Sequence, residues 1–327
     1  MVHNPVEQAL ALAARGQAAQ ALACLIEGGD AGDVHALMQH AVWRLTGAVV
    51  PRDLDAARVL LRRAVAIGHV DGALMEIALA ANGNGNARTP DWQTARALLD
   101  IAAAGDPIAE AQRALLQRMQ LTADGAPPAL PQPQVLNEAP RIVRYPALFT
   151  PDECAHVATV AAELLEPASV LDPRTGRAMP HPIRTSDDGA IGPTREDLVV
   201  RALNLRIAAA SGTRVEQGEP LTVLRYAPGQ QYRRHLDTIA GAANQRIRTV
   251  LIYLNQGFGG GETVFPEFGL TIRPQGGDAI LFDTLLPDGT PDTRALHAGQ
   301  PVTAGVKWLA TRWIRARDVD PWTLRAD

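Results

Sequence analysis

The stretch from Asp124 to Pro140, DGAPPALPQPQVLNEAP, constrains the fold most strongly because it holds five prolines. Proline lacks an amide donor and disfavours helices and central strands, so this segment is predicted to be a stiff, extended linker. A chain of 327 residues is also longer than one average domain requires. We therefore predict two domains, residues 1–123 and 141–327, joined by a linker at 124–140.

Residues 5–122 are rich in Ala and Leu at helical spacing and contain an internal repeat. Ala57–Leu61 (ARVLL) recurs 38 residues later as Ala95–Leu99 (ARALL), and each copy is followed by a glycine, Gly68 or Gly105. A weaker copy near Ala19 is followed by Gly28. Small residues allow close helix packing, and a left-handed glycine can end a helix. A period of this length predicts stacked helical hairpins, an all-α solenoid.

This N-terminal segment resembles tetratricopeptide-type repeats of the SEL-like class, including the NGNG loop at 82–85. The resemblance implies a concave surface that holds a peptide or protein. An unrelated all-helical bundle is the alternative that the loose motifs leave open.

Composition excludes several classes of function. Hydrophobic residues make up 46% of the chain and charged residues 20%, as in ordinary globular proteins. A net charge of −4 and 4% aromatic residues argue against nucleic acid or an anionic membrane as partner. Cys24 and Cys154 are far apart and form no disulfide framework. The N-terminus lacks a signal-peptide pattern and no long apolar run is present, so we predict a cytoplasmic protein.

The C-terminal part is mixed, with helical patterns near 151–165 and 195–211 and short alternating runs such as LTVLRY, TVLIYLN and KWLATRWIR. Its segment YRRHLD places His235 and Asp237 two residues apart, on one face of a predicted strand. His297 is the candidate third ligand. Two histidines and one carboxylate form the facial triad of non-haem iron(II) oxygenases and leave three coordination positions free. A bidentate 2-oxo acid can take two of these positions and dioxygen the third.

A lysine supports the same interpretation. In the alternating segment KWLATRWIR, Lys307 shares one face with Leu309, Thr311 and Trp313. A lysine on the inward face of a strand is costly to bury unless an anion meets it, and the distal carboxylate of 2-oxoglutarate would be that anion. The alternative is a surface lysine whose charged end reaches solvent.

Residues 140–316 resemble the prolyl 4-hydroxylase family of iron(II)- and 2-oxoglutarate-dependent dioxygenases. The motifs that carry the resemblance follow the family's order: PRIVRYPALFTPDEC, PIRTS, GEPLTVLRYAPGQQYRRHLD, TVLIYLN, GGGETVFPE, RPQGGDAILF and LHAGQPVTAGVKWLATRWI. The resemblance implies a double-stranded β-helix, or jelly roll, with flanking helices.

Residue by residue, the resemblance implies roles for several side chains. His235, Asp237 and His297 would bind iron(II), and Lys307 would bind 2-oxoglutarate. Further residues would complete the site: Tyr226 and Thr263 as hydrogen-bond partners of the co-substrate, Trp313 in the same pocket, and Arg184 and Tyr232 on the substrate side. Ascorbate would serve as a reductant.

The implied substrate is a prolyl residue of a peptide or protein, which the helical repeats could hold near the cleft. Three alternatives stay open. The chain could hydroxylate a free amino acid or another small molecule, it could be a repeat-based interaction protein with a degenerate oxygenase domain, or it could be a cupin-like metal protein without 2-oxoglutarate. The short connection TIAGAANQRIR after Asp237, where the family often has a longer one, puts the substrate identity in doubt.

Overall fold

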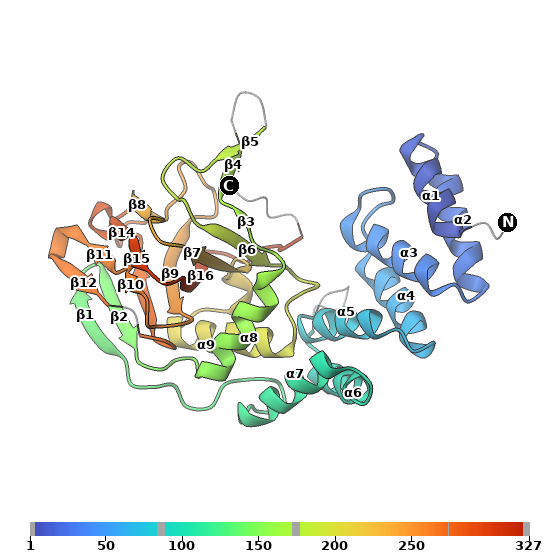
Figure 1. Cartoon of the computed structure of the whole chain (residues 1–327), viewed down its shortest axis with the longest axis horizontal. Helices are drawn as coiled ribbons and strands as arrows, with labels where there is room; N and C mark the ends of the chain where they lie inside the picture. Colours follow the sequence, from blue (N-terminus) through green and yellow to red (C-terminus); the bar gives the residue numbers. More distant parts are fainter. Residues whose placement is uncertain (1–3, 84–88, 172–176, 274, 323–327) are drawn as a thin grey trace. The chain divides into compact units, whose positions relative to one another are not determined.

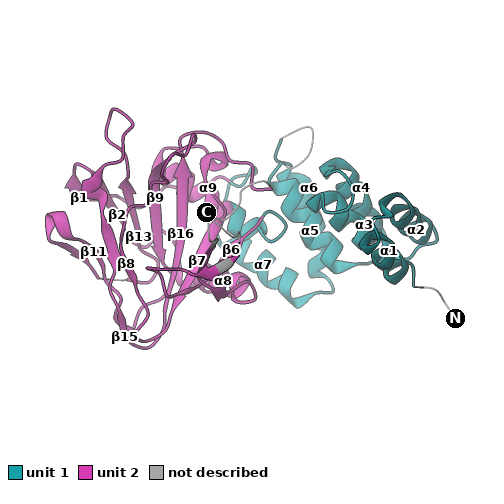
Figure 2. Cartoon of the chain, turned by 90° about the horizontal axis from the view of Figure 1, so that it is seen from above, with its two compact units in different colours: residues 1–125, 193–201 teal, residues 126–192, 202–327 magenta. Residues whose placement is uncertain are grey.

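A computed structural model describes residues 4–83, 89–171, 177–273 and 275–322. The chain divides into two compact units, residues 1–125 with 193–201 and residues 126–192 with 202–327. Figure 2 shows them in teal and magenta. None of the helices in the described ranges is both long and apolar enough to cross a membrane.

The described part of the first unit contains consecutive helices, each packed against the next along the chain, an arrangement compatible with helical repeats. Five of the helices begin at an acidic or amide side chain that accepts a hydrogen bond from the first turn, namely Asn4, Asp33, Asp53, Asp91 and Asp106. The helices are α1 (Pro5–Ala14), α2 (Ala18–Asp30), α3 (Val34–Thr46), α4 (Leu54–Ala66), α5 (Val70–Ala81), α6 (Trp92–Ala103) and α7 (Pro107–Arg118).

The glycines predicted to end these helices differ from one another. Gly68 follows α4 with a left-handed φ of 87°, as predicted. Gly105 follows α6 without a left-handed φ, and Gly28 lies inside α2. A Cβ on Gly28 would lie 2.9 Å from the Cβ of Ala36, so this glycine permits close packing of α2 against α3. Gly32, with φ 86°, is the left-handed residue after α2. Asn84 and Gly85 of the predicted NGNG loop lie outside the described residues.

The second unit is built on two antiparallel sheets with a shared core. The larger sheet has the order β1-β2-β13-β9-β16-β7-β6-β3, and the smaller has the order β12-β11-β14-β8 (Figure 1). Buried Leu224, Tyr253 and Phe282 of the larger sheet pack with Phe265 and Ile272 of the smaller one. Facing sheets with an apolar core between them confirm the predicted double-stranded β-helix, which is not a closed barrel.

The strands are short, and two two-stranded sheets, β4-β5 and β10-β15, accompany the main sheets. The strands are β1 (Gln134–Glu138), β2 (Arg141–Tyr145), β3 (Glu166–Pro167), β4 (Ser169–Leu171), β5 (Ala178–Pro180), β6 (Asp187–Ile191), β7 (Leu221–Tyr226), β8 (Tyr232–His235), β9 (Arg246–Tyr253), β10 (Gly259–Gly260), β11 (Thr263–Phe265), β12 (Leu270–Ile272), β13 (Ala279–Asp283), β14 (His297–Gly299), β15 (Val302–Ala304) and β16 (Lys307–Arg315).

The two helices predicted in the C-terminal part are α8 (Pro151–Ala162) and α9 (Leu198–Ser211), and all but residues 198–201 of them belong to this unit. Helix α8 begins with a capping box between Thr150 and Glu153 and packs against β6 and β7. Glu153 also accepts two hydrogen bonds from Arg206 of α9, so a buried ion pair joins the helices.

The end of the segment predicted to be a linker belongs to the larger sheet. Gln134–Glu138 forms β1, which pairs with β2 at the sheet edge. The physical reason is local: between Pro133 and Pro140 no proline interrupts the chain, so every residue there except those prolines offers an amide donor.

Candidate metal and co-substrate site

The three predicted metal ligands converge in the second unit. His235 is the last residue of β8, and it pairs directly with His297, the first residue of β14. The carboxylate of Asp237 lies 3.5 Å from His235 Nε2 and 3.7 Å from His297 Nε2. One potential ligand atom from each of the three residues lies within 4.8 Å of the others. The sequence therefore brings two imidazoles and a carboxylate to one point.

Asp237 reaches this point differently from the prediction. Strand β8 ends at His235, so Asp237 stands beyond the strand and regular alternation does not place it. Two contacts from β9 hold it instead: Thr249 Oγ1 donates to Asp237 Oδ2 over 2.5 Å, and Arg246 Nη1 donates to the Asp237 carbonyl over 3.3 Å.

Backbone carbonyls set the tautomer of both histidines. Nδ1 of His235 lies 2.8 Å from the Arg233 carbonyl, and Nδ1 of His297 lies 3.1 Å from the Ala295 carbonyl. Because a carbonyl only accepts, each Nδ1 must carry a proton, so in the neutral ring the lone pair is on Nε2, the atom that faces Asp237. Metal-ligating histidines are oriented in this way.

The charges of the three groups also suit a divalent metal. Burial lowers the pKa of His297 to about 4, with the nearby His235 adding to the effect and Asp237 opposing it. Burial alone would raise the pKa of Asp237, yet His297, His235 and Thr249 together hold it well below its usual range. A neutral His297 imidazole and an ionised Asp237 carboxylate are the forms that bind iron(II) in a facial triad.

Lys307 lies buried at the start of β16, directly opposite Tyr226 of β7. Its Nζ donates to the Gly261 carbonyl over 2.8 Å, the one hydrogen bond that it makes to described residues. The rings of Tyr226 and Tyr253 lie 5.4 and 5.5 Å from Nζ. Burial lowers the pKa of Lys307 to about 8, although Glu262 opposes the shift. An ammonium with donors to spare in such surroundings fits a carboxylate ligand.

Lys307 is also the only lysine among the 31 lysine and arginine residues of the chain. Arginine supplies every other permanent cation, including the guanidinium groups of the buried ion pairs. An ammonium differs from a guanidinium in being compact and in titrating when buried. The one lysine therefore occupies a buried position beside the rings of Tyr226 and Tyr253.

Tyr253 connects the remaining co-substrate candidates and was missed by sequence reasoning. Its hydroxyl donates to Thr263 Oγ1 over 2.7 Å, and both residues are buried. Thr263 and Lys307 thus both contact Tyr253, and Lys307 also lies near the ring of Tyr226. The motif TVLIYLN contains Tyr253 on the same strand face as Thr249, so the period of two was the available signal.

Trp313 lies away from this group, on the side of Asp237. It pairs with Thr249 across β16 and β9, and the Arg246 guanidinium lies 4.1 Å from the centroid of its ring. Trp313 and Lys307 both lie on β16, and the contact with Arg246 connects Trp313 to a residue that binds the Asp237 carbonyl. Its predicted role in the co-substrate pocket stays a prediction.

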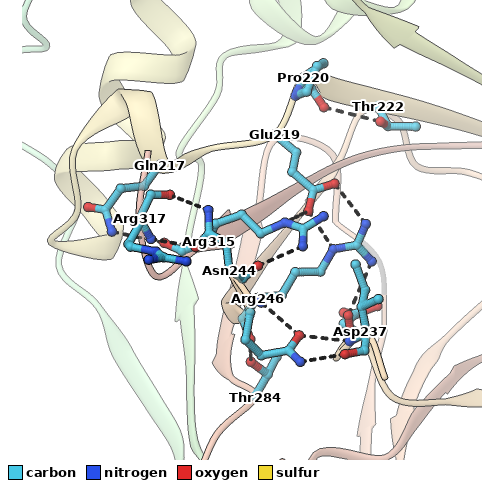
Figure 3. A network of polar contacts seen from close by, with 12 residues as sticks. Gln217, Glu219, Pro220, Thr222, Asp237, Asn244, Arg246, Thr284, Arg315 and Arg317 are labelled. Carbon is cyan, nitrogen blue, oxygen red and sulfur yellow. Dashed lines mark hydrogen bonds and ion pairs between the residues drawn. The ribbon is translucent and has the colours of Figure 1, made fainter. Parts of the chain in front are cut away.

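A buried carboxylate fixes Arg246 in turn. Glu219 accepts two hydrogen bonds from Arg246, at 2.7 and 2.8 Å, and a third from Arg315 (Figure 3). The side chain of Gln245 bonds both the amide and the carbonyl of Ile239, in the loop between Asp237 and Arg246. Sequence reasoning missed this network, because which carboxylate meets which arginine depends on the strand order.

Arg184 and Tyr232, the substrate-side candidates, lie beside the triad. An isolated antiparallel bridge pairs them, and the Arg184 guanidinium lies 5.5 Å from the centroid of the Tyr232 ring. That ring stacks on His235 with a centroid distance of 3.5 Å. Tyr232 therefore forms a wall directly against a predicted metal ligand.

The comparisons agree with this geometry. Residues 221–315 match the model of the 2OG-Fe(II) oxygenase superfamily. Prolyl 4-hydroxylase 1 of Arabidopsis thaliana is 34% identical over 205 residues, which cover 57% of this chain and 72% of the relative. Prolyl 4-hydroxylase 5 of the same plant is 34% identical over 209 residues, with 57% and 72% covered.

Among solved structures, the 2OG complex of viral collagen prolyl hydroxylase vCPH from Paramecium Bursaria Chlorella virus-1 is 26% identical. The match covers 54% of this chain and 96% of that chain, with a TM-score of 0.43. From the extent of its similarity to the plant enzymes, the chain belongs to the prolyl 4-hydroxylase family of iron(II)- and 2-oxoglutarate-dependent oxygenases.

Proposed function

We propose that this enzyme hydroxylates a prolyl residue of a peptide or protein, with iron(II) held by His235, Asp237 and His297 and 2-oxoglutarate anchored at Lys307. The observation that carries the proposal is the convergence of one ligand atom from each of the three residues within 4.8 Å, in the same core as a buried ammonium. The plant relatives are named for the same reaction.

Each side chain has a defined task in this proposal. When bound, iron(II) supplies the dioxygen chemistry that couples decarboxylation of 2-oxoglutarate to hydroxylation of the substrate. The Nε2 atoms of His235 and His297 and the Asp237 carboxylate would hold the metal. Lys307 pairs with the distal carboxylate, while Tyr226 and Thr263 complete the polar lining of the pocket. Over the reaction, substrate, dioxygen and 2-oxoglutarate give hydroxylated product, succinate and carbon dioxide.

Arg184 and Tyr232 are proposed to contact the substrate, and Trp313 is proposed to line the pocket that receives 2-oxoglutarate. Tyr232 covers the imidazole of His235, and Trp313 lies next to the strand that carries Thr249, so both aromatic rings border the metal position. Flat aromatic faces suit the ring of a prolyl residue. Arg184 offers a buried cation to the carbonyl groups of a peptide.

The test is an assay of the purified chain with iron(II), 2-oxoglutarate and prolyl peptides, which scores succinate and the gain of one oxygen atom in the peptide. The His235→Ala variant should lose metal and turnover together, whereas His35→Ala, at an exposed histidine of the repeat unit, should retain both. Turnover that persists in His235→Ala, or turnover of free proline but no peptide, would refute the proposal. Ascorbate is proposed as a reductant and should extend the linear phase of the assay.

We also propose that residues 1–123 form a repeat domain that docks the polypeptide substrate. The support is a set of exposed apolar side chains on its helices, among them Val59 (58% exposed), Ile101 (66%) and Ile108 (61%). Ile101→Glu should then raise KM for a protein substrate and leave KM for a short peptide unchanged. A cytoplasmic location is proposed from the two free cysteines, Cys24 and Cys154, and cell fractionation tests it.

A further inference from the structure

The ion pair between Arg184 and Asp188 binds neither the metal nor the co-substrate in the proposed function. Arg184 Nη2 donates to Asp188 Oδ2 over 2.9 Å, and the two side chains are only 10% and 23% exposed. Asp188 lies in β6, opposite Leu224 of β7, a member of the core between the two sheets. The pair therefore faces the same interior as the predicted metal ligands.

The geometry of this pair is incomplete. A guanidinium and a carboxylate usually form two parallel hydrogen bonds, and a buried pair gains most from doing so. Here Arg184 Nε and Asp188 Oδ1 are both shielded from solvent, yet neither has a partner among the described residues. Burial accordingly raises the pKa of Asp188, with Arg184 opposing the shift. Pairing with Asp188 therefore does not by itself explain the position of the Arg184 guanidinium.

The second contact of Arg184 accounts for its position. Its guanidinium lies 5.5 Å from the centroid of the Tyr232 ring, within the range of a cation–π interaction. The Tyr232 ring stacks on the imidazole of His235 at 3.5 Å with an interplanar angle of 11°. A continuous series of contacts therefore leads from Asp188 through Arg184 and Tyr232 to His235.

We propose that Asp188 is a positioning residue, which anchors Arg184 so that the guanidinium holds the Tyr232 ring against the metal ligand His235. The inference deepens the proposed function and rests on it. Asp188 touches neither metal nor substrate in this scheme. We call the series of contacts from Asp188 through Arg184 and Tyr232 to His235 the relay. The Asp188 carboxylate fixes one end of it, and the orientations of the Tyr232 ring and the His235 imidazole depend on that carboxylate.

The experiment compares two neighbouring aspartates. Asp188→Asn keeps the shape of the side chain and removes its charge. Asp187→Asn is the matched control, because Asp187 is the adjacent residue of β6 and also pairs with an arginine, Arg225, at 2.6 Å. Successive residues of a strand face opposite sides, so Asp187 points away from the relay. Cobalt(II), added with 2-oxoglutarate, is the probe, and its visible ligand-field spectrum and Kd are measured.

We expect Asp188→Asn to shift the cobalt(II) spectrum, to weaken cobalt(II) about tenfold and to raise KM for a prolyl peptide about tenfold. KM for 2-oxoglutarate should stay within about twofold, since Lys307 is not part of the relay. Asp187→Asn should match the unsubstituted chain in all four measurements, and Asp188→Glu should recover part of the loss. A spectrum in Asp188→Asn identical to that of Asp187→Asn would overturn the relay.

Two further variants keep the proposal testable if Asp188→Asn folds poorly. Arg184→Lys retains the ion pair but loses the planar group that lies over the ring, so it should reproduce the spectral shift. In a Tyr232→Leu background, Asp188→Asn should add nothing further, and additive effects would contradict the relay. An unsubstituted chain that binds no cobalt(II) would instead overturn the proposed metal site itself, so the two failures are distinguishable.

Discussion

Thr249 Oγ1 donates a 2.5 Å hydrogen bond to the Oδ2 of Asp237, a residue 12 positions away that belongs to no strand. This bond and the contact from Arg246 position the carboxylate where the end of β8 no longer does. The geometry of the metal site thus depends on β9 as much as on the strand that precedes Asp237.

Thr249→Val removes this donor while keeping the shape of the side chain. We expect iron(II) or cobalt(II) affinity to fall about tenfold, because the freed carboxylate can rotate away from the two imidazoles. Metal titration followed by absorbance measures the change. Thr222→Val is the control, since Thr222 is also a buried strand threonine, but its hydroxyl donates to the nearby Pro220 carbonyl and not to a carboxylate of the site. Equal losses in both variants would contradict a specific role for Thr249.

Binding of 2-oxoglutarate should depend on pH through Lys307. The lysine must carry its proton to pair with the distal carboxylate, and burial lowers its pKa to about 8 in the absence of an anion. Affinity should therefore be constant below about pH 8 and fall about tenfold per pH unit above it, until the raised pKa of the complex is reached. Calorimetric titrations between about pH 7 and 9.5 test this. A flat profile would show that Lys307 does not bind the co-substrate.

The same shift predicts how stability changes with pH. The folded pKa of Lys307, about 8, lies below its ordinary value of 10.5, so between these limits the unfolded chain holds a proton that the folded chain has lost. This term makes the free energy of unfolding rise with pH across that window. Lys307→Met should remove this pH dependence. At pH 7 the free energy of unfolding of this variant should exceed that of the unsubstituted chain by up to about 3 kcal/mol.

The difference between Lys307→Met and the unsubstituted chain should disappear near the upper limit of this window. Denaturant unfolding without 2-oxoglutarate at several pH values measures both free energies. A difference that does not vary with pH would mean that the ammonium is already compensated in the folded chain.

Gly261 supplies the carbonyl that binds Lys307, and it has a φ of 70°. Gly261→Ala adds a Cβ that would lie 3.1 Å from Lys307 Cδ and 3.0 Å from the Phe258 ring, in addition to the cost of a left-handed alanine. We expect KM for 2-oxoglutarate to rise about tenfold. Gly257→Ala is the control for backbone strain without a steric contact, because Gly257 has φ 86° and no atom lies within 4 Å of its Cβ position. Steady-state kinetics should show the rise only for Gly261.

Glu219 compensates two buried guanidinium groups, those of Arg246 and Arg315. Glu219→Gln should lower the free energy of unfolding by about 3 kcal/mol, because the cations lose their charge partner. It should also weaken the hold of Arg246 on the Asp237 carbonyl and thereby reduce metal affinity. Chemical denaturation and metal titration measure the two effects. Glu216→Gln, at an exposed position nearby, should change neither.

The sequence predicted the residues of the site better than the reasons for their positions. The spacing of His235 and Asp237 identified the ligands, but Asp237 is held by β9 rather than by strand alternation. Lys307 was placed correctly because alternation in KWLATRWIR is a local property. Thr249 and Tyr253 lie on β9, which becomes a neighbour of the other strands of the site only when the sheet forms. Alternation therefore gives the strand face that they share but not the side chains that they bind.

The repeat unit illustrates the same limit. The helices follow from local spacing and from N-caps such as Asp53 and Asp106, which sequence reasoning can use directly. The role of Gly28 depends on Ala36 of the next helix and differs from that of Gly68 in an otherwise similar position. A glycine that ends a helix and one that permits close packing cannot be distinguished until the neighbouring helix is placed.

The single lysine has a practical consequence for anyone who handles this protein. Aldehydes, active esters and other amine-directed reagents find only one side chain to modify, and it lies in the pocket that receives the co-substrate. Coupling the protein to a resin or a dye through lysine would therefore also inactivate the enzyme. Conversely, protection of this amine from such reagents by 2-oxoglutarate would report that the pocket is occupied, without a measurement of turnover.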